Sequence, residues 1–330
     1  MTLVRILLSS LLILNSYFVS SQEVPDSFDP EVLNDALTTI KDDSSKFEVY
    51  LRLLEAYRLS APAKAKKYHE KIIFQSENGN FHAIRAKSYS QVTLIAQANA
   101  QLDSMLAFSQ LATTEAMQSQ DTGLYLQCMN NEAIALASHN KGKEAIELLN
   151  TAIALSRTIL DTNALLQSQL YLANIYSQYG DFTNTIELIN ADSAIWNRMP
   201  SSVKAQFWYV KANALFSLQR NEAALTLYKR AYPVFEQLPN PFNLLQLLNN
   251  LSTCYAQLQA YDSALAVNAE AIPLALQLGD KRGLGNAYIS RANVYYLQEN
   301  VDSAIVYAQY AEETLTPLND PFTYIQVLDL

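Results

Sequence analysis

Apolar residues along most of this chain recur at steps of three and four, which is the spacing of one face of an α-helix. The pattern is clear from Asp161 onward, where the apolar positions are Leu165, Leu166, Leu170, Leu172, Ala173 and Tyr176. Gly180-Asp181 interrupts this run, because glycine accepts the left-handed conformation that closes a helix. A second apolar run then extends from Phe182 to about Trp196. A turn this short predicts two antiparallel helices.

This helix pair repeats along the chain with a period of 40 residues. Residue types that cap helix N-termini precede successive apolar runs at spacings of 40, 40, 39, 40 and 40, at Asp121, Asp161, Ser201, Asn240, Asp280 and Asp320. A mostly small column on the second helices keeps the same spacing, at Ala65, Met105, Ala145, Thr185, Ala224, Ala264 and Ala304. Small residues at fixed positions let two backbones pack closely, and a fixed period of this length is typical of a stacked solenoid.

The first helices carry matching columns. One is bulky (Tyr89, Met129, Gln169, Trp208, Leu248, Tyr288), and the next, four residues later, is small (Thr93, Ala133, Ala173, Ala212, Ser252, Ala292). In the second helices a further small column is broken at Asp192, which predicts a looser contact there.

These columns resemble the tetratricopeptide repeat family. The matching positions include Leu248, Leu251, Ser252, Tyr255, Tyr261, Ala264 and Ala271, and, one unit earlier, Trp208, Ala212, Ala224, Tyr228 and Ala231. The period exceeds the family's usual 34 residues, so each helix is expected to be about a turn longer, as in the long-repeat members of bacterial regulators. The resemblance implies an all-α, right-handed superhelical solenoid of antiparallel helix pairs, with a concave face formed by the first helices.

The pattern divides the chain into four segments. Residues 1–21 are expected to be a signal peptide, 22–44 a linker with a short capping helix that starts at Asp29-Pro30, 45–316 seven repeats, and 317–330 the start of an incomplete eighth repeat. In that last segment Phe322, Ile325, Val327 and Leu328 extend an apolar face, so we expect either a longer chain or a partner that covers this end.

The N-terminus has the features of a cleaved export signal. Arg5 is its only charge, an apolar run follows from Ile6 to Leu14, and Val19 and Ser21 have the spacing that a signal peptidase needs. A mature protein that begins at Gln22 in the periplasm or outside the cytoplasm is therefore expected. An uncleaved N-terminal anchor is the alternative.

Composition narrows the classes of partner. Half of the 330 residues are hydrophobic and only 7 are glycine, which fits helices, and the formal charge of −9 disfavours a nucleic-acid partner. Cys128 and Cys254 lie three repeats apart, too far for a disulfide, so both are expected to be buried free thiols.

No set of residues in the sequence indicates catalysis, a cofactor or a metal. His69, His82 and His139 each lack a second histidine or cysteine at ligand spacing. Gly283-Leu284-Gly285 follows no strand and lacks a third glycine, so we interpret it as a turn after Gly279-Asp280 rather than a phosphate-binding loop.

Two polar columns on the first helices suggest a binding surface instead. One runs through Lys87, Gln127, Gln167, Gln206, Gln246 and Asn286, and the other through Leu94, Ile134, Asn174, Asn213, Thr253 and Asn293. An amide can both donate to and accept from an extended peptide backbone. The candidate groove comprises Gln167, Asn174, Gln206, Tyr209, Asn213, Phe216, Gln246, Asn249, Asn286, Asn293 and Tyr296. The alternative is that these amides hydrogen-bond to the next repeat or to water.

We therefore expect an exported protein- or peptide-binding scaffold with a neutral groove, which forms the sensor region of a longer regulatory protein. A stand-alone envelope assembly factor is the alternative, and an enzyme of glycan or peptide processing is a remote one. Contact with a membrane is expected only through an uncleaved N-terminus or a segment beyond Leu330.

Overall fold

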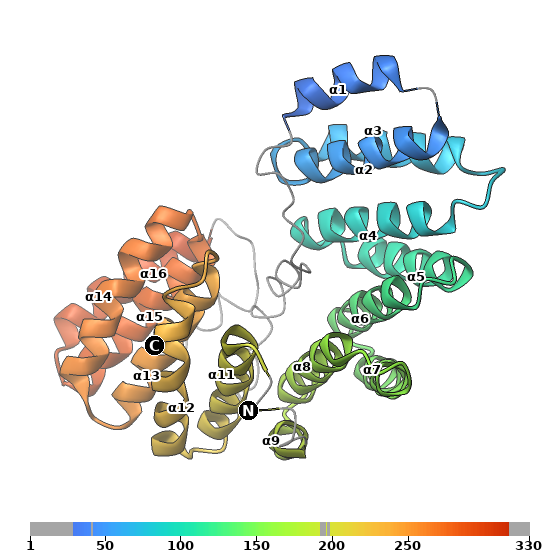
Figure 1. The fold of residues 1–330 in the computed structure, drawn as a ribbon. Coiled ribbons are helices and arrows are strands. Elements are labelled where there is room, and N and C mark those ends of the chain that lie inside the picture. The colour runs from blue at the N-terminus through green and yellow to red at the C-terminus, as the bar shows by residue number, and fades with distance from the viewer. Residues whose placement is uncertain (1–28, 41, 192–195, 197–198, 317–330) are drawn as a thin grey trace. The chain divides into compact units, whose positions relative to one another are not determined.

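The computed structural model describes residues 29–40, 42–191, 196 and 199–316, and every described element is an α-helix or a short turn (Figure 1). Several sequence predictions lie outside these residues. They are the signal peptide, the break in the small column at Asp192, the cap at Asp320 and the apolar face of residues 317–330.

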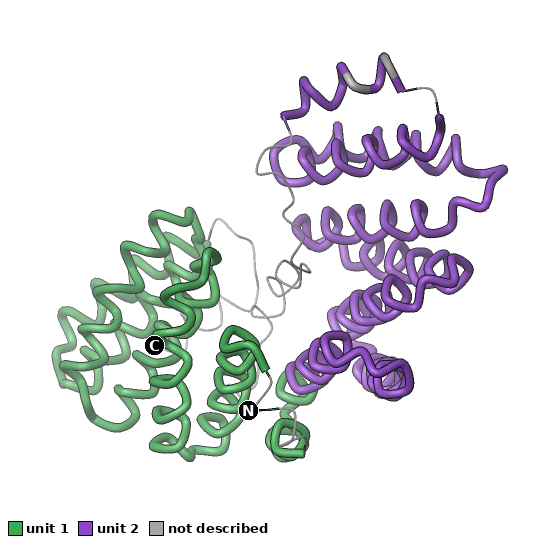
Figure 2. Tube along the Cα trace, in the orientation of Figure 1, with its two compact units in different colours: residues 1–13, 176–330 green, residues 14–175 purple. Residues whose placement is uncertain are grey.

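The described residues form two compact units, one within residues 14–175 and one that begins at Tyr176 (Figure 2). The helices of the first unit are α1 (Pro30–Thr39), α2 (Asp43–Ser60), α3 (Pro62–Gln75), α4 (His82–Ala98), α5 (Leu102–Gln118), α6 (Thr122–Ser138), α7 (Gly142–Thr158) and most of α8 (Thr162–Gln178). The second unit contains α9 (Phe182–Ala191), α11 (Ser201–Ser217), α12 (Asn221–Phe235), α13 (Phe242–Gln257), α14 (Tyr261–Leu278), α15 (Lys281–Leu297) and α16 (Val301–Leu315).

Within each unit, consecutive helices pack as pairs and the pairs stack. The closest packing joins α4 with α5, α11 with α12, and α15 with α16. Successive first helices also touch, as α2 does with α4 and α13 with α15. Because the first helices of neighbouring pairs lie closer together than the second helices, each stack curves with its first helices inside. The fold class predicted from the apolar pattern, an all-α solenoid of helix pairs, is confirmed.

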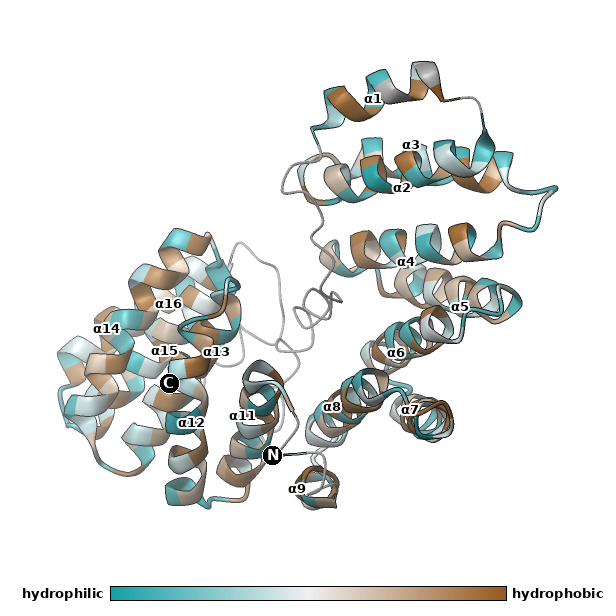
Figure 3. Ribbon diagram, viewed as in Figure 1, coloured by the Kyte–Doolittle hydropathy of each residue, from teal (hydrophilic) through white to brown (hydrophobic). Residues whose placement is uncertain are grey.

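The predicted small columns are the most buried positions of these stacks. Ala133, Ala173, Ala212 and Ser252 have at most 1% of their surface exposed, and Ala145, Ala224 and Ala264 have none. Figure 3 shows the corresponding change from hydrophobic to hydrophilic residues around each helix. The 40-residue register is therefore correct in the second unit as well as in the first.

The helix caps follow the prediction with two exceptions. The carboxylates of Asp121, Asp161 and Asp280 each accept a hydrogen bond from the backbone N–H three residues later, at 2.9–3.0 Å, as N-caps do. Asn240 is wrong as the cap of α13: Pro241 holds the cap position, and the Asn240 side chain, one residue earlier, accepts from the backbone N–H of Phe242. Ser201 is wrong as a cap: it is the first residue of α11, and Pro200, whose side chain offers no oxygen, holds the cap position.

Most turns share one backbone conformation, which the sequence does not reveal because few of the turn residues are glycine. Nine of the turns between helices contain a residue with φ between 54° and 78°, namely Ala100, Gln120, Asn140, Leu160, Gly180, Gln219, Gln259, Gly279 (φ 64°) and Glu299. In eight of them the next residue donates its N–H to a carbonyl five residues back, as in the bond of 2.8 Å from Lys141 to Leu136, whereas the N–H of Asp121 donates to the Ser119 hydroxyl. This is the usual glycine C-cap of helices. Gly180 was predicted for this role, but seven of these turns adopt the conformation without glycine.

The motif Gly283-Leu284-Gly285 lies in α15 and not in a turn, so that interpretation is wrong. Asp280 is the N-cap of α15, and both glycines are buried in the first turns of this helix. A Cβ on Gly285 would lie 2.3 Å from the side chain of Leu315, and one on Gly283 would lie 2.6 Å from that of Leu245. The two glycines therefore allow α15 to pack closely against α16 and α13.

Candidate peptide-binding face of the second unit

The candidate groove residues of the second unit lie on the inner helices α11, α13 and α15. Residues Gln206, Gln246 and Asn286 occupy one column, and Asn213 and Asn293 occupy another, on neighbouring helices. Gln167 and Asn174 lie on α8 within the first unit and do not belong to this face.

Part of this face is an internal hydrogen-bond network. The Asn213 Oδ1 accepts from the Tyr228 hydroxyl at 2.6 Å and from Nδ2 of Asn250 at 3.0 Å. The same Nδ2 donates to the Tyr209 hydroxyl at 2.9 Å. The network joins α11 to α12 and to α13. Asn250, which links the two helices of neighbouring repeats, was missed in the sequence, although it lies next to Asn249 in a column that is largely polar.

Burial has shifted the acid–base properties of the tyrosines in this network. Burial raises the pKa of Tyr209 to about 12, and it also raises the pKa of Tyr228. Both hydroxyls are therefore neutral hydrogen-bond partners at physiological pH. The network can position side chains, but it contains no group that could act as a base near neutral pH.

Asn249 joins the next two repeats. Its Nδ2 donates to the backbone carbonyl of Gly283 at 3.1 Å, while its buried Oδ1 has no donor among the described residues. The Oε1 of Gln206 is likewise buried without a donor. Asn213 and Asn249 are 5% and 8% exposed, so both side chains lie in the packed interior of the unit.

The remaining amides of the second unit are available. Gln246, Asn286 and Asn293 are partly exposed, and their side chains make no hydrogen bond within the described part of the chain. Tyr296 is 62% exposed at the end of α15, and Phe216 packs at the edge of the core around Tyr228. We call Gln246, Asn286, Asn293 and Tyr296 the open amide face.

The candidate residues on α8 make their hydrogen-bond contacts within the same helix. Asn174 donates from Nδ2 to the Leu170 carbonyl at 2.9 Å and is 8% exposed, whereas Gln167 makes a longer contact of 3.4 Å with the Tyr171 hydroxyl. A role for either residue in a groove stays a prediction.

The inner helices of the second unit are not neutral as a whole. α11, α13 and α15 contain no Asp or Glu but carry Lys204, Lys211, Lys281, Arg282 and Arg291. The second helices carry acidic residues instead, at Glu187, Glu222, Asp262, Glu270, Asp302, Glu312 and Glu313. Although the chain has a charge of −9, these inner helices carry only positive charges, while α12 carries Lys229 and Arg230 beside its acidic residue.

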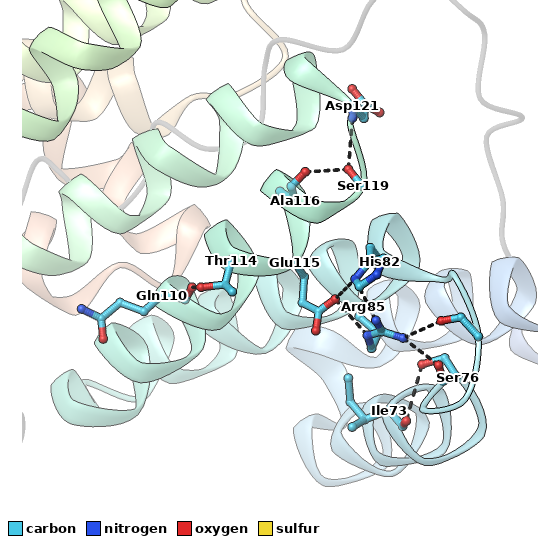
Figure 4. A network of polar contacts seen from close by, with 11 residues as sticks. Ile73, Ser76, His82, Arg85, Gln110, Thr114, Glu115, Ala116, Ser119 and Asp121 are labelled. Atoms are coloured by element: carbon cyan, nitrogen blue, oxygen red, sulfur yellow. Dashed lines mark hydrogen bonds and ion pairs between the residues drawn. The ribbon is translucent and has the colours of Figure 1, made fainter.

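Two further polar clusters in the first unit hold helices together. Arg85 donates from Nη1 to the carbonyls of Ser76 and Gly79, while its Nε and Nη2 face Glu115 and His82 (Figure 4). His69 lies against the rings of Tyr89 and Phe108, and burial lowers its pKa to about 4.

Metal and thiol chemistry find little support in the described residues. No group of three metal-ligating side chains occurs there, and His139 makes one contact of 2.8 Å to Asp103. Cys128 and Cys254 are buried and unpaired as predicted, and burial raises the pKa of each thiol to about 11, so neither is a reactive thiolate at neutral pH.

Residues 204–277 match the tetratricopeptide repeat family. This segment is a tetratricopeptide repeat region, which agrees with the resemblance of the columns. The matched segment begins in α11 and ends in α14, and it contains Trp208, Ala224, Tyr255 and Ala264 of the predicted columns. Among curated proteins no sequence match was found.

Solved structures of tetratricopeptide-like proteins share the fold. RapI without ligand is 11% identical with a TM-score of 0.65, and the alignment covers 83% of this chain and 98% of RapI. NprR in complex with its cognate peptide NprX is 15% identical with a TM-score of 0.59 over 91% of this chain and 90% of NprR. BtubC from P. vanneervenii is 19% identical with a TM-score of 0.58 over 66% and 92% of the two chains.

None of the described helices combines the length and the apolar composition that crossing a bilayer would require.

Proposed function

We propose that this tetratricopeptide repeat chain is a non-enzymatic scaffold that binds an extended protein segment on the open amide face. The supporting observation is that Gln246 on α13 and Asn286 and Asn293 on α15 are partly exposed and make no hydrogen bond within the described residues. A peptide backbone offers the complementary groups at every residue. Two of the structural relatives, NprR and a Rap protein, are crystallised with peptides or signalling factors, which favours this class of ligand.

The binding site combines amides with a basic surrounding. The amides recognise main chain and are therefore tolerant of sequence, whereas the lysines of α11 and Lys281 and Arg282 at the start of α15 favour ligands with a negative charge. We therefore expect binding to weaken moderately as salt is added, in contrast to the weak salt dependence that amides alone would give.

The chain is further proposed to act outside the cytoplasm, as the sensor region of a regulatory protein. Support for export comes from Arg5, the apolar run that follows it, and the small residues at Val19 and Ser21. Mass spectrometry of the protein from its native cells tests this step: a mature N-terminus at or near Gln22 is expected, and an intact Met1 on exported or cytoplasmic material would contradict it.

Binding is tested with an immobilised library of short synthetic peptides and the full chain. The triple variant Gln246→Ala, Asn286→Ala and Asn293→Ala is expected to bind captured peptides at least tenfold more weakly, because each lost amide contributes about 0.5–1.5 kcal/mol. The matched control replaces the exposed amides Gln277 and Gln309 of α14 and α16 by Ala. Equal binding by the triple variant and the control would show that the ligand sits elsewhere.

A further inference from the structure

A single arginine lies among four tyrosines at the last described helix pair. The Arg291–tyrosine cluster consists of Tyr288, Arg291 and Tyr295 on α15 and of Tyr307 and Tyr310 on α16. The guanidinium carbon of Arg291 lies 4.8 Å from the ring centre of Tyr307 and 5.9 Å from that of Tyr295. The rings of Tyr295 and Tyr307 stack at 5.5 Å, and Tyr310 lies 5.6 Å from Tyr288.

The preceding repeat fills the same positions with apolar packing. Forty residues earlier, Leu248 and Leu251 occupy the columns of Tyr288 and Arg291, and they are 1% and 5% exposed. On the second helix, Glu270 occupies the column of Tyr310. This repeat has therefore replaced a buried leucine by a cation, and it has a tyrosine where its neighbour has a carboxylate. Stacking of the repeats alone does not require either change.

Arg291 has no acidic partner in the described part of the chain. Its Nε is buried without an acceptor, and no ion pair or hydrogen bond of its guanidinium is seen there. Other ionisable residues of the same column are satisfied. Lys211 donates to Oδ1 of Asn190 at 2.7 Å, and the carboxyl of Glu132 is hydrogen-bonded to Thr113. An arginine that has lost part of its water and gained only ring contacts gains most from an anion.

We propose that the Arg291–tyrosine cluster is a second binding site, which takes a carboxylate side chain of a protein partner. The guanidinium lies over the ring of Tyr307 and its Nε is buried, so the two terminal nitrogens Nη1 and Nη2 supply the paired N–H bonds that fit a carboxylate. The charge of −9 disfavours a nucleic-acid phosphate as the occupant.

This site is separate from the open amide face. Asn293 follows Arg291 by two residues, which places the two side chains about 200° apart around α15. A partner that reaches both would have to wrap α15, and a small ligand can occupy either one alone. Loss of binding at one site therefore does not imply loss at the other.

The probe is N-acetylglutamate N-methylamide, titrated into the full chain while the arginine Nε–H signals are followed by NMR. The signal of Arg291, assigned from the Arg291→Lys variant, is expected to shift and saturate with a dissociation constant on the order of 1–10 mM. The matching glutamine compound, N-acetylglutamine N-methylamide, is expected to cause no saturable shift. Arg291→Gln should abolish binding of the glutamate probe, as read from the ring signals of Tyr307, and Lys229→Gln, which removes a cation stacked on Tyr255, should leave it unchanged.

Three results would overturn the proposal. One is the absence of a saturable shift in the unaltered protein, and a second is equal binding of the glutamate probe to Arg291→Gln. The third is saturable binding of inorganic phosphate with none of the glutamate probe, which would assign the site to phosphate. If Arg291→Gln does not fold, Arg291→Lys replaces it. That variant keeps the charge but lacks the planar fork, so a loss of about threefold or more in affinity is expected, and unchanged affinity would refute the paired geometry.

Discussion

Arg85 donates from Nε to Oε2 of Glu115 across 2.9 Å, and this ion pair fastens the start of α4 to the end of α5. The guanidinium of Arg85 also donates to the Ser76 carbonyl at 2.6 Å, so the connection that follows α3 is held by the same side chain. The Nδ1 of His82 lies 2.8 Å from both Arg85 and Glu115, and it can accept from the first or donate to the second.

These contacts of Arg85 with Glu115 and the Ser76 carbonyl, which we call the Arg85 clamp, predict a large effect of a single substitution. Arg85→Ala leaves Glu115 and a backbone carbonyl without their donor in a mostly buried site, so the free energy of unfolding should fall by about 2–4 kcal/mol. Urea unfolding followed by circular dichroism measures the change. Lys87→Ala, two residues further at an exposed position, is the control and should change stability by less than about 0.5 kcal/mol. Similar midpoints for the two variants would contradict a structural role of the clamp.

His69 gives the first unit a defined dependence on pH. Its pKa of about 4 in the folded chain lies below the ordinary value of 6.5, because burial disfavours the charged ring. Between these two values the unfolded chain binds a proton that the folded chain does not, so stability decreases as the pH falls from about 6.5 to 4. Since the ring retains some exposure, we expect a loss of about 1–2 kcal/mol over this range.

His69→Phe tests the assignment, because phenylalanine keeps the ring contacts with Tyr89 and Phe108 but cannot be protonated. The variant loses the contact of 2.9 Å with the Ser88 hydroxyl, which lowers stability equally at both pH values. The difference in unfolding free energy between pH 6.5 and 4 should therefore shrink. An identical pH profile for the variant would assign the dependence to other groups.

The fold could be predicted from the sequence because it depends on columns that repeat. Ala224 and Ala264 are fully buried at the positions that the 40-residue register gives them, and Asp121 and Asp280 cap helices as their residue types indicate. These features are local or periodic, so each repeat supports the interpretation of the others. Ser201 failed as a cap because the register shifts by one residue near this point, which places Pro200 before the helix.

The site was predicted less well, because side-chain partners depend on distances between helices that a column does not encode. Asn213 and Asn293 share a column, yet Asn213 hydrogen-bonds with Tyr228 and Asn250, whereas Asn293 has no such partner in the described residues. The difference arises from the second helix: Tyr228 can reach the first amide, and Ala308 occupies the equivalent position in the later repeat. The environment of Arg291 could likewise not be predicted from its column, because it depends on the tyrosine rings of the neighbouring helix α16.

The left-handed turns predict that a glycine introduced at a turn residue can stabilise the fold. They also predict that replacing a glycine already present in such a turn destabilises it. Leu160 has φ 59° and is 86% exposed, so Leu160→Gly removes backbone strain and an exposed apolar side chain. We expect an increase in unfolding free energy of about 0.5–1 kcal/mol, because the left-handed conformation costs 1–2 kcal/mol that glycine's greater flexibility when unfolded partly offsets.

Gly279→Ala is the reciprocal change. A Cβ at Gly279 would meet no atom within 4 Å, so the only penalty is its φ of 64° and the expected loss is about 1 kcal/mol. Thermal unfolding of both variants is the measurement. A lower melting temperature for Leu160→Gly together with an unchanged one for Gly279→Ala would show that the turns are not held in this conformation in solution.

Two adjacent alanines on α12 provide a matched test of the packing register. Ala224 is fully buried in the core around Tyr228, whereas Ala223 is exposed. Ala224→Leu should lower the unfolding free energy by about 1–3 kcal/mol through overpacking, and Ala223→Leu should change it by less than about 0.5 kcal/mol. The two substitutions add the same side chain to the same helix, so their difference isolates the packing contribution. Equal effects would mean that the helix is rotated about its axis relative to the assigned register.

The two asparagines of one column separate structure from binding. Asn213→Ala removes the acceptor of the buried Tyr228 hydroxyl and a partner of Asn250, so unfolding should become easier by about 1–3 kcal/mol. Asn293→Ala removes no internal bond in the described residues and should leave stability within about 0.5 kcal/mol while it weakens peptide capture. Tyr228→Phe, which removes the hydroxyl but keeps the ring, should reproduce part of the loss seen with Asn213→Ala. If Asn293→Ala instead destabilised the fold as much as Asn213→Ala, the amides of this column would be inter-repeat contacts throughout, and the open amide face would lose the residue that distinguishes it from the packed interior.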